Sequence, residues 1–377
     1  MSANPDVSKR SDLAGNIQQL PGVIMDSFVY EGLASRVVFG FGTLARLRDE
    51  VRRLGCSRAL VLTTAAQRNR GEDIVAELGN LAAGLYSNAA MHTPVEVTRD
   101  ALKFAQELEV DCLIALGGGS TIGLSKAIAL HTDLLQIVIP TTYAGSEATP
   151  IIGQTENGLK TTQRTLKVMP EVILYDVDLS MTLPLQMTVT SAMNAIAHAI
   201  EALYSKDANP LISTLAEQGI SALARALPRL TSDLTDKEAR SDALFGGWAC
   251  GVCLGAVGMS IHHKLCHTLG GSFGLPHAET HTVVLPHAVA YNAEAAPEAM
   301  ARIARALGVS DAAQGLFDLA YVNGGPTRLA DIGMYEADLP RAVELACSSP
   351  YWNPRPIEQD AIRHLLNNAF KGVRPSN

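Results

Sequence analysis

The chain has 377 residues, more than one hydrophobic core usually holds, so the length predicts two domains. Hydrophobic residues make up 47% of it, enough to bury a core in each domain. The formal net charge of −8 argues against nucleic acid or an anionic membrane as partner, since either would favour a basic surface. A small-molecule enzyme is the simplest remaining class.

Residues 1–24 are polar and show no periodicity, so we expect an extension without regular structure. There is no charged-then-apolar start and no apolar run of about 18 residues, so neither a signal peptide nor a membrane span is expected. The six cysteines lie mostly in apolar segments without the spacing of a secreted disulfide scaffold. We therefore expect reduced cysteines and a cytoplasmic location.

Between residues 25 and 187, short apolar strands alternate with helices. The predicted strands are 36–40, 58–64, 83–87, 112–116, 135–140 and 171–175, and the predicted helices are 43–54 (capped by Thr43), 72–81, 93–108 and one from Gly117–Ser120 to about 131. This alternation predicts an α/β domain with a mostly parallel sheet. Ligands of such sheets bind at the carboxyl ends of the strands.

Strand signals stop after that point, and residues 188–377 predict an all-helical domain. The predicted helices are 188–204, 211–227, 237–257, 260–269, 283–307, 310–322, 338–348 and 357–370. We expect Gly270-Gly271 to end the helix at 260–269. Cys250 and Cys253 have the spacing of a metal pair, but without a second such pair core packing is favoured over zinc. The cleft between the two domains is the predicted active site.

Two loops at strand ends predict a nucleotide site. Gly117-Gly118-Gly119-Ser120 follows an apolar strand and opens a helix, where bare backbone and free N–H groups suit a diphosphate. The next strand end offers the hydroxyls of Thr141, Thr142 and Ser146. Ordinary turns are the alternative for both loops, and the first is not the GxGxxG fingerprint.

Histidines gather in the segment 262–281, which holds five of the chain's ten. His263 and His267 are four residues apart, so on a helix they share one face. His277 follows a proline that can turn it back over the other two. A single buried histidine is more often a core residue, but the set predicts one pocket.

Asn194 and His198 form a second polar pair at the same spacing, inside an otherwise apolar helix. Two pairs of this kind favour a single ligand site.

The combination of GGGST after a strand, PTTYAGSE, NAIAH, HKLCH and the later PH resembles the iron-containing (group III) alcohol dehydrogenase superfamily, and within it the maleylacetate reductases. The resemblance covers about 28–375, including the closing Asn353-Pro354-Arg355-Pro356. It implies a dehydroquinate synthase-like architecture with a dinucleotide-binding domain and a homodimer. It also implies NADH- or NADPH-dependent reduction of the C=C bond of maleylacetate to 3-oxoadipate, a step in aromatic compound catabolism.

Metal-dependent members hold their metal with an aspartate and three histidines. By motif, Asn194 stands at the aspartate position, the ligand histidines correspond to His198, His263 and His277, and His267 is the neighbouring histidine. Asn is a weak, neutral ligand for Fe²⁺ or Zn²⁺, so no metal is expected. Those members also carry an aspartate in the helix after GGGS, and this chain has Gly123 at that position. The resemblance implies that maleylacetate reductases differ from the metal-dependent members at both positions, 194 and 123.

The resemblance suggests a role for each residue. Maleylacetate is a dianion, and a carboxylate about 4 Å from one of its charges would cost roughly 4 kcal/mol at an effective dielectric of 20, which gives a reason for Asn194. We expect His198, His263 and His277 to bind the substrate and the enolate oxygen, and His267 to donate the proton.

Three alternatives remain open. A metal-dependent alcohol dehydrogenase acting on a small alcohol or aldehyde would need metal despite Asn194. A lyase of the dehydroquinate synthase type would be expected to have more Lys and Arg around the cleft. A non-catalytic metal carrier would leave GGGST unexplained.

Overall fold

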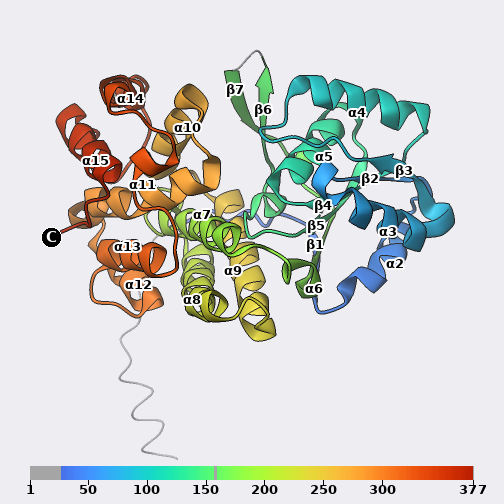
Figure 1. The fold of residues 1–377 in the computed structure, drawn as a ribbon, viewed down its shortest axis with the longest axis horizontal. Coiled ribbons are helices and arrows are strands. Elements are labelled where there is room, and N and C mark those ends of the chain that lie inside the picture. The colour runs from blue at the N-terminus through green and yellow to red at the C-terminus, as the bar shows by residue number, and fades with distance from the viewer. Residues whose placement is uncertain (1–26, 157–158, 377) are drawn as a thin grey trace, which may run out of the picture.

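The computed structural model describes residues 27–156 and 159–376. An α/β part and a helical part lie side by side (Figure 1), which confirms the predicted fold class. The domain boundary that we propose at 187–188 falls in the first turn of α7, Leu185–Leu203. The extension predicted for residues 1–24 lies outside the described residues.

Six strands form a parallel sheet in the order β1-β8-β5-β4-β2-β3. They are β1 Arg36–Gly40, β2 Ala59–Leu62, β3 Ala82–Tyr86, β4 Cys112–Gly117, β5 Leu135–Pro140 and β8 Val172–Asp176. The central strands are almost wholly apolar because helices cover both of their faces. Since β2, β4 and β5 are neighbours and parallel, the loops that follow them meet at one edge of the sheet.

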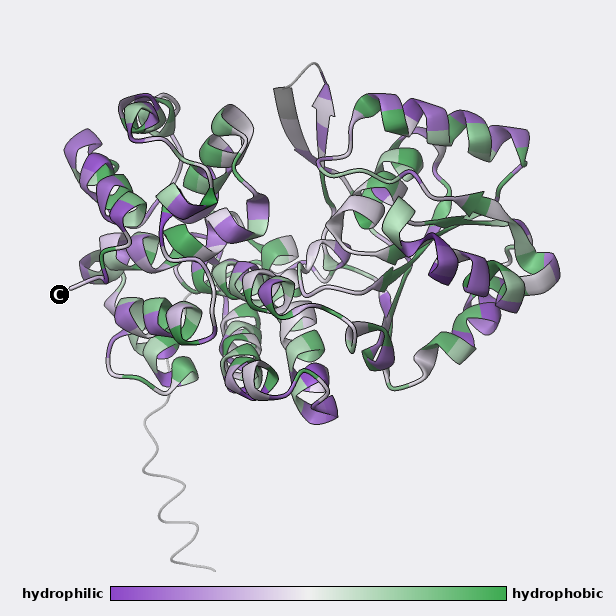
Figure 2. Cartoon of the chain, viewed as in Figure 1, coloured by the Kyte–Doolittle hydropathy of each residue, from purple (hydrophilic) through white to green (hydrophobic). Residues whose placement is uncertain are grey.

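The helices of this domain are α2 Leu47–Arg53, α3 Arg68–Leu78, α4 Val95–Glu107, α5 Gly119–Thr132 and α6 Val177–Ser180. In α4 the buried Thr98, Ala101 and Ala105 recur every three or four residues, flanked by the partly buried Val97, Leu102 and Phe104, and hydrophilic residues lie on the exposed side of the helix (Figure 2). The predicted Thr43 cap is wrong. Thr43 opens a 3₁₀ turn, and its hydroxyl donates to the Tyr175 carbonyl at 2.9 Å, which ties the turn to β8.

An antiparallel hairpin of β6, Ile151–Glu156, and β7, Leu159–Arg164, was not predicted. Its strands contain many Thr, Gln and charged residues, so they lack a clear apolar alternation. Ile152 anchors the hairpin by packing against Ala127 and Val168. The hairpin is therefore stabilised by tertiary contacts and cannot be recognised from a local sequence pattern.

The helical domain is built around α7, in which every residue from Thr188 to Leu203 is buried. Its other helices are α8 Pro210–Ser232, α9 Lys237–Ala256, α10 Ile261–Phe273, α11 His277–Asn292, α12 Pro297–Leu307, α13 Ala312–Val322, α14 Leu339–Cys347 and α15 Gln359–Lys371. Of these, α8, α9 and α11 pack directly on α7. In the described part of the chain, no single helix is long and apolar enough to cross a membrane. The pair α9 and α10 would be long and apolar enough only if taken together, and the two helices meet at a bend of 97°.

Gly270-Gly271 does not end its helix, contrary to prediction. The helix α10 runs on to Phe273 and stops at Gly274, whose φ of 69° is the left-handed conformation that glycine adopts freely. Each internal glycine costs about 1 kcal/mol relative to Ala, which the packing of the rest of α10 offsets. A pair of glycines is therefore a weaker stop signal than one glycine in the left-handed conformation.

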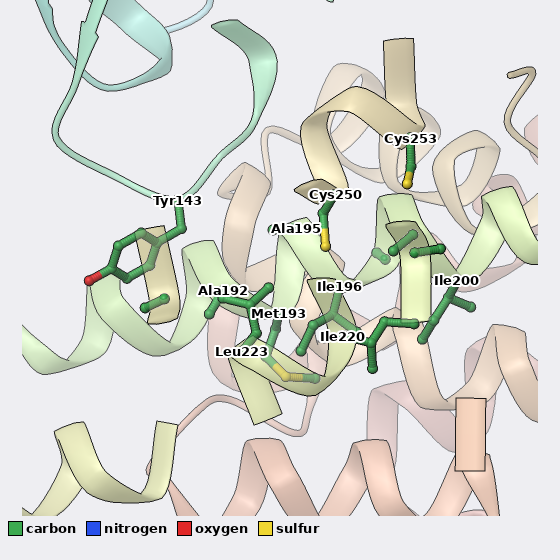
Figure 3. Close-up of a cluster of buried hydrophobic side chains, with 14 of the residues drawn as sticks. Tyr143, Ala192, Met193, Ala195, Ile196, Ile200, Ile220, Leu223, Cys250 and Cys253 are labelled. Atoms are coloured by element: carbon green, nitrogen blue, oxygen red, sulfur yellow. The ribbon is translucent and has the colours of Figure 1, made fainter. Parts of the chain in front are cut away.

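Cys250 and Cys253 pack in the apolar core, as predicted. Both are fully buried; Cys250 lies beside Ala195 and Ile196 of α7 (Figure 3), and the Cys253 thiol donates to the Ile212 carbonyl of α8 at 3.7 Å. All six cysteines are free.

A buried arginine joins the two domains. Arg240 of α9 donates to Tyr143 Oη and to Thr188 Oγ1, both at 3.0 Å. Gly251 of the same helix lies so close to Gly145 that a Cβ there would overlap its backbone. The loop after β5 is thus fixed against the helical domain.

Candidate active site

A cavity of about 370 Å³ opens where the loops after β2, β4 and β5 meet the start of α7. The sheet edge contributes Thr64, Ala66, Gln67, Arg70, Gly118, Gly119, Ser120, Thr141 and Thr142. The connection to the helical domain contributes Leu179, Thr182, Leu183, Pro184 and Met187. The cavity therefore lies between the two domains, at the carboxyl ends of the strands.

The glycine loop fits the phosphates of a dinucleotide. It begins α5, a helix of 14 residues whose first N–H groups have no partner within the helix and attract anions. A Cβ at Gly118 would lie 3.0 Å from the Thr142 side chain, and Gly119 borders open space within 4 Å. Side chains here would fill the room that a phosphate needs.

Two residues predicted to bind the cofactor do not line the cavity. Gly117, with a φ of 147°, turns the chain where a Cβ would lie 2.7 Å from Gln67 Oε1. Ser146 accepts at its carbonyl from Lys126 Nζ at 2.6 Å. In this structure both residues belong to the loops whose neighbouring residues, such as Gly118 and Thr142, line the cavity.

Three helices form the predicted cluster. Asn194 and His198 come from α7, His263 and His267 from α10, and His277 begins α11. His198 Nδ1 lies 2.8 Å from His263 Nε2, and the rings of His263 and His267 are 6.2 Å apart. The two polar pairs seen in the sequence therefore belong to one site.

The members of the cluster differ in exposure. Asn194 and His198 are each 3% exposed and His263 is 5% exposed, whereas His277 is half-buried and His267 is exposed. Asn194 Oδ1 is buried without a hydrogen-bond partner among the described residues. His267 accordingly lies on the solvent side of the cluster.

The cluster adjoins the cavity along the loop after β5. His198 Nε2 lies 3.2 Å from the carbonyl oxygen of Ala144, two residues after Thr142 in the cavity wall. Met187, which also lines the cavity, stands about two turns before Asn194 on α7. A substrate held at the cluster would therefore lie next to a cofactor in the cavity.

Sequence reasoning missed three buried members of the cluster, Glu201, His262 and His281. Glu201 Oε2 lies 2.8 Å from His263 Nδ1, and His262 Nε2 lies 2.9 Å from His281 Nδ1. A signal for Glu201 was present, because it follows His198 by three residues and Asn194 by seven, on the same face of a helix.

Burial controls the charge of these rings. It lowers the pKa of His198 well below its ordinary value, and the neighbouring His263 lowers that pKa further. Burial first and nearby histidines second also lower the pKa of His262 and of His281. Because these pKa values are lowered, the three rings are neutral at pH 7, and each offers one donor and one acceptor.

The donor set does not fit the metal of the metal-dependent members. Asn194 supplies no charge, and the two ring nitrogens of His263 lie within hydrogen-bond distance of His198 and Glu201. In the described chain, the three donors that approach within 4.8 Å of one another are a different set, His262, Cys266 and His281. Burial raises the pKa of the Cys266 thiol well above its ordinary value, which opposes the thiolate that a metal requires.

Comparisons with known proteins cover both domains. A family model described as iron-containing alcohol dehydrogenase matches residues 34–177, and one described as the C-terminal part of the Fe-containing alcohol dehydrogenase family matches 188–370. Maleylacetate reductases of Rhizobium sp. (strain MTP-10005) and Burkholderia cepacia are both 54% identical, over 93% of this chain and 100% of theirs. The crystal structure of maleylacetate reductase from Agrobacterium tumefaciens has a TM-score of 0.91 and 55% identity, over 93% of this chain and 100% of that chain.

Proposed function

The chain belongs to the iron-containing alcohol dehydrogenase family, and we propose that within it this protein is a maleylacetate reductase. It reduces the C=C bond of maleylacetate to give 3-oxoadipate, an oxidoreductase step on a CH–CH group in aromatic compound catabolism. The observation that carries this proposal is a cavity bordered by a glycine loop at a helix N-terminus, next to a histidine cluster that has Asn194 at the position of the metal-binding aspartate.

The cofactor is a nicotinamide dinucleotide, NADH or NADPH, which when bound supplies the hydride that adds to the alkene carbon β to the ketone. Gly118, Gly119 and Ser120 hold its phosphates at the start of α5. The hydroxyls of Thr141 and Thr142 lie across the same cavity. Gly117 and Ser146, which the sequence predicts to bind the cofactor, stand in these same two loops beside the residues that line the cavity.

Hydride addition turns the ketone into an enolate, which must be stabilised and then protonated at the neighbouring carbon. His198, His263 and His277 bind the substrate and the enolate oxygen, and Asn194 orients them. His267 donates the proton, a role that suits its exposed position, since it can be reprotonated from water.

The reaction proceeds without metal. The neutral amide of Asn194 does not repel the dianionic substrate as a carboxylate would. Support comes from the donor set, because Asn194 brings no negative charge to the position where metal-dependent members have a carboxylate ligand.

We also infer a cytoplasmic homodimer that binds neither nucleic acid nor membrane. Free cysteines suit a reducing compartment. β1 is an edge strand, and Phe39 and Phe41 at its end are 36% and 48% exposed, which suits pairing with a second copy. Light scattering in solution should give about twice the chain mass of 40.0 kDa.

The decisive experiment follows the loss of NADH absorbance with maleylacetate as substrate, with and without EDTA. We expect turnover to survive the chelator, and added Fe²⁺ or Zn²⁺ to leave the rate unchanged. If EDTA removes most activity and either ion restores it, the metal-free mechanism is wrong. The alternative, a metal-dependent dehydrogenase of a small alcohol or aldehyde, would then be the better assignment.

A further inference from the structure

A buried lysine ties together the two loops of the cofactor site. Lys126 lies on α5, the helix that also carries Ser120, and is 1% exposed. Its Nζ donates to the carbonyl oxygens of Ser146 and Thr149, both at 2.6 Å, and of Ile151 at 2.9 Å. It also lies 3.1 Å from Thr149 Oγ1. The lysine therefore joins the helix that begins at the glycine loop to the end of the loop after β5.

The contacts of Lys126 favour its charged form. Burial lowers the pKa of Lys126 to about 7, and the nearby carboxylate of Glu147 opposes that shift. An ammonium group has three N–H donors for the three carbonyl oxygens, whereas a neutral amine has two, and its lone pair would face an acceptor. An apolar side chain would leave all three oxygens without this donor, at the cost of a lost hydrogen bond each. The position therefore needs a long side chain with several donors.

The loop that Lys126 holds also forms the wall of the site. Thr141 and Thr142 line the cofactor cavity, and the carbonyl oxygen of Ala144 lies 3.2 Å from His198 Nε2. One loop thus borders both the cavity and the histidine cluster. A displacement of this loop would change the position of the cavity wall relative to the cluster.

The two sides of this loop are fixed by different domains. On the helical side, Arg240 donates to Tyr143 Oη at 3.0 Å, and Gly145 lies so close to Gly251 that a Cβ on either would overlap the backbone of the other. On the side of the sheet, Lys126 joins the loop to α5, whose first turn borders the cavity. The lysine therefore acts where the helix that would hold the cofactor phosphates meets the loop that contacts the cluster.

We propose that Lys126 is a positioning residue for hydride transfer, which holds the loop after β5 against α5 and so sets the distance between the nicotinamide and a substrate at the histidine cluster. Lys126 is not one of the described residues that line the cavity, so it acts through the loop. Reacting atoms must lie about 3–3.5 Å apart, and a misplacement of about 1 Å can cost about 10² in rate. This inference rests on the proposed function, which supplies the hydride transfer.

Kinetics of Lys126→Met test the proposal, because Met is also long and unbranched but has no N–H donor. We expect kcat per NADH-binding site to fall by about 10–10², while the Kd for NADH stays within about fivefold, since the start of α5 is unchanged. Fluorescence titration with NADH gives the Kd and the number of binding sites. A purely structural role would reduce the number of sites and leave kcat per site unchanged.

Two further variants complete the comparison. Lys126→Arg keeps a charge and several donors, but a planar guanidinium cannot direct them to all three oxygens. Its kcat per site should lie between those of Lys126→Met and the wild type, and at least about threefold below the wild type. The matched control is Glu50→Gln, which removes a buried charge paired with Arg36 and Arg53 on α2 and its neighbourhood in the same domain. It should leave kcat per site within about twofold.

A kcat per site within about twofold of the wild type in folded Lys126→Met would overturn the inference. If Lys126→Met does not fold, Lys126→Arg decides, and an unchanged kcat per site in that variant would overturn it equally. If the wild type does not reduce maleylacetate, the proposed function fails, and amide hydrogen exchange still tests the role of Lys126. Residues 141–151 should exchange faster in Lys126→Met, or in Lys126→Arg, than in the wild type, with β4 unchanged. Equal exchange in this loop would show that Lys126 does not hold it.

Discussion

Asn194 is the residue at which this site departs from the metal-dependent members. Its amide is 3% exposed, and Oδ1 meets no hydrogen-bond partner among the described residues. A buried polar atom without a partner costs about 1–3 kcal/mol, so it is expected to gain one when the site is occupied. The substrate is the natural candidate, because Asn194 shares a face of α7 with His198.

Converting Asn194→Asp should raise KM for maleylacetate by at least about tenfold, because it places a carboxylate beside a dianion. The same change supplies the missing ligand charge, so the affinity for Zn²⁺ should rise. Steady-state kinetics and calorimetric titration with Zn²⁺ measure the two effects. Asn194→Ala is the control, since it removes the amide without adding charge. Equal KM values for Asn194→Asp and the wild type would refute the charge argument.

On the scale of elements, α5 and the loop before α4 pack so closely that each depends on a particular residue of the other. Thr93 directs its side chain to Gly123, where a Cβ would overlap Thr93 Oγ1. The threonine holds a φ of 48°, an unusual conformation for a β-branched residue. In this chain the threonine therefore occupies the space beside Gly123, at the position where metal-dependent members carry an aspartate.

Gly123→Asp should lower the free energy of unfolding by about 1–3 kcal/mol, because the new side chain has no room. Adding Thr93→Gly should recover most of that loss, since it clears the space and accepts a positive φ. Urea denaturation of the single and double variants gives both values. Gly271→Asp in α10, where a Cβ meets nothing within 4 Å, is the matched control. A loss as large at Gly271 as at Gly123 would show that crowding is not the cause.

Elements were predictable where local pattern and burial agree. The apolar runs of β4 and β5 and the long apolar segment of α7 are examples. The hairpin β6–β7 was not, because it depends on distant contacts, among them Lys126 Nζ donating to the Ile151 carbonyl at 2.9 Å. The same limit applied to the site. The contact of Glu201 with His263 joins residues 62 apart, and it depends on how α7 packs against α10.

For the molecule as a whole, buried histidines couple stability to pH. Burial lowers the pKa of His287 from 6.5 to about 4. As the pH falls below about 6.5, the unfolded chain takes up a proton at this residue, whereas the folded chain does not until about pH 4. The stability that His287 contributes is therefore complete above pH 6.5 and is lost as the pH falls toward 4.

In the wild type, His287 should account for a loss of about 2 kcal/mol in the free energy of unfolding between pH 7 and pH 5. His287→Gln should abolish that part of the pH dependence. Urea denaturation at the two pH values measures the difference between variant and wild type. His364→Gln, at an exposed position of α15, serves as the control and should keep the wild-type dependence. Identical pH dependence in His287→Gln and the wild type would mean that His287 titrates alike in the folded and unfolded chain.

The cofactor cavity also spans both domains, and its wall bears on the choice between NADH and NADPH. Selectivity for NAD usually comes from a carboxylate near the end of the second strand, which repels a 2′-phosphate. In the part of the chain that the structure describes, Thr64 and Gln67 line the cavity there, and none of its lining residues is acidic. Arg70 lines it too and donates to Thr182 Oγ1 at 2.7 Å, whereas Arg68 pairs with Glu72 at 2.9 Å.

NADH and NADPH should therefore both serve, with kcat/KM values within about two orders of magnitude, since the described residues that line the cavity include no carboxylate to repel a 2′-phosphate. Arg70→Ala should reduce kcat/KM more for NADPH than for NADH, because a guanidinium in the wall can pair with a phosphate. Arg68→Ala is the matched control, since its guanidinium is held by Glu72, and it should change both values alike. A preference above about 10³ for either cofactor would show that another residue reads the 2′ position.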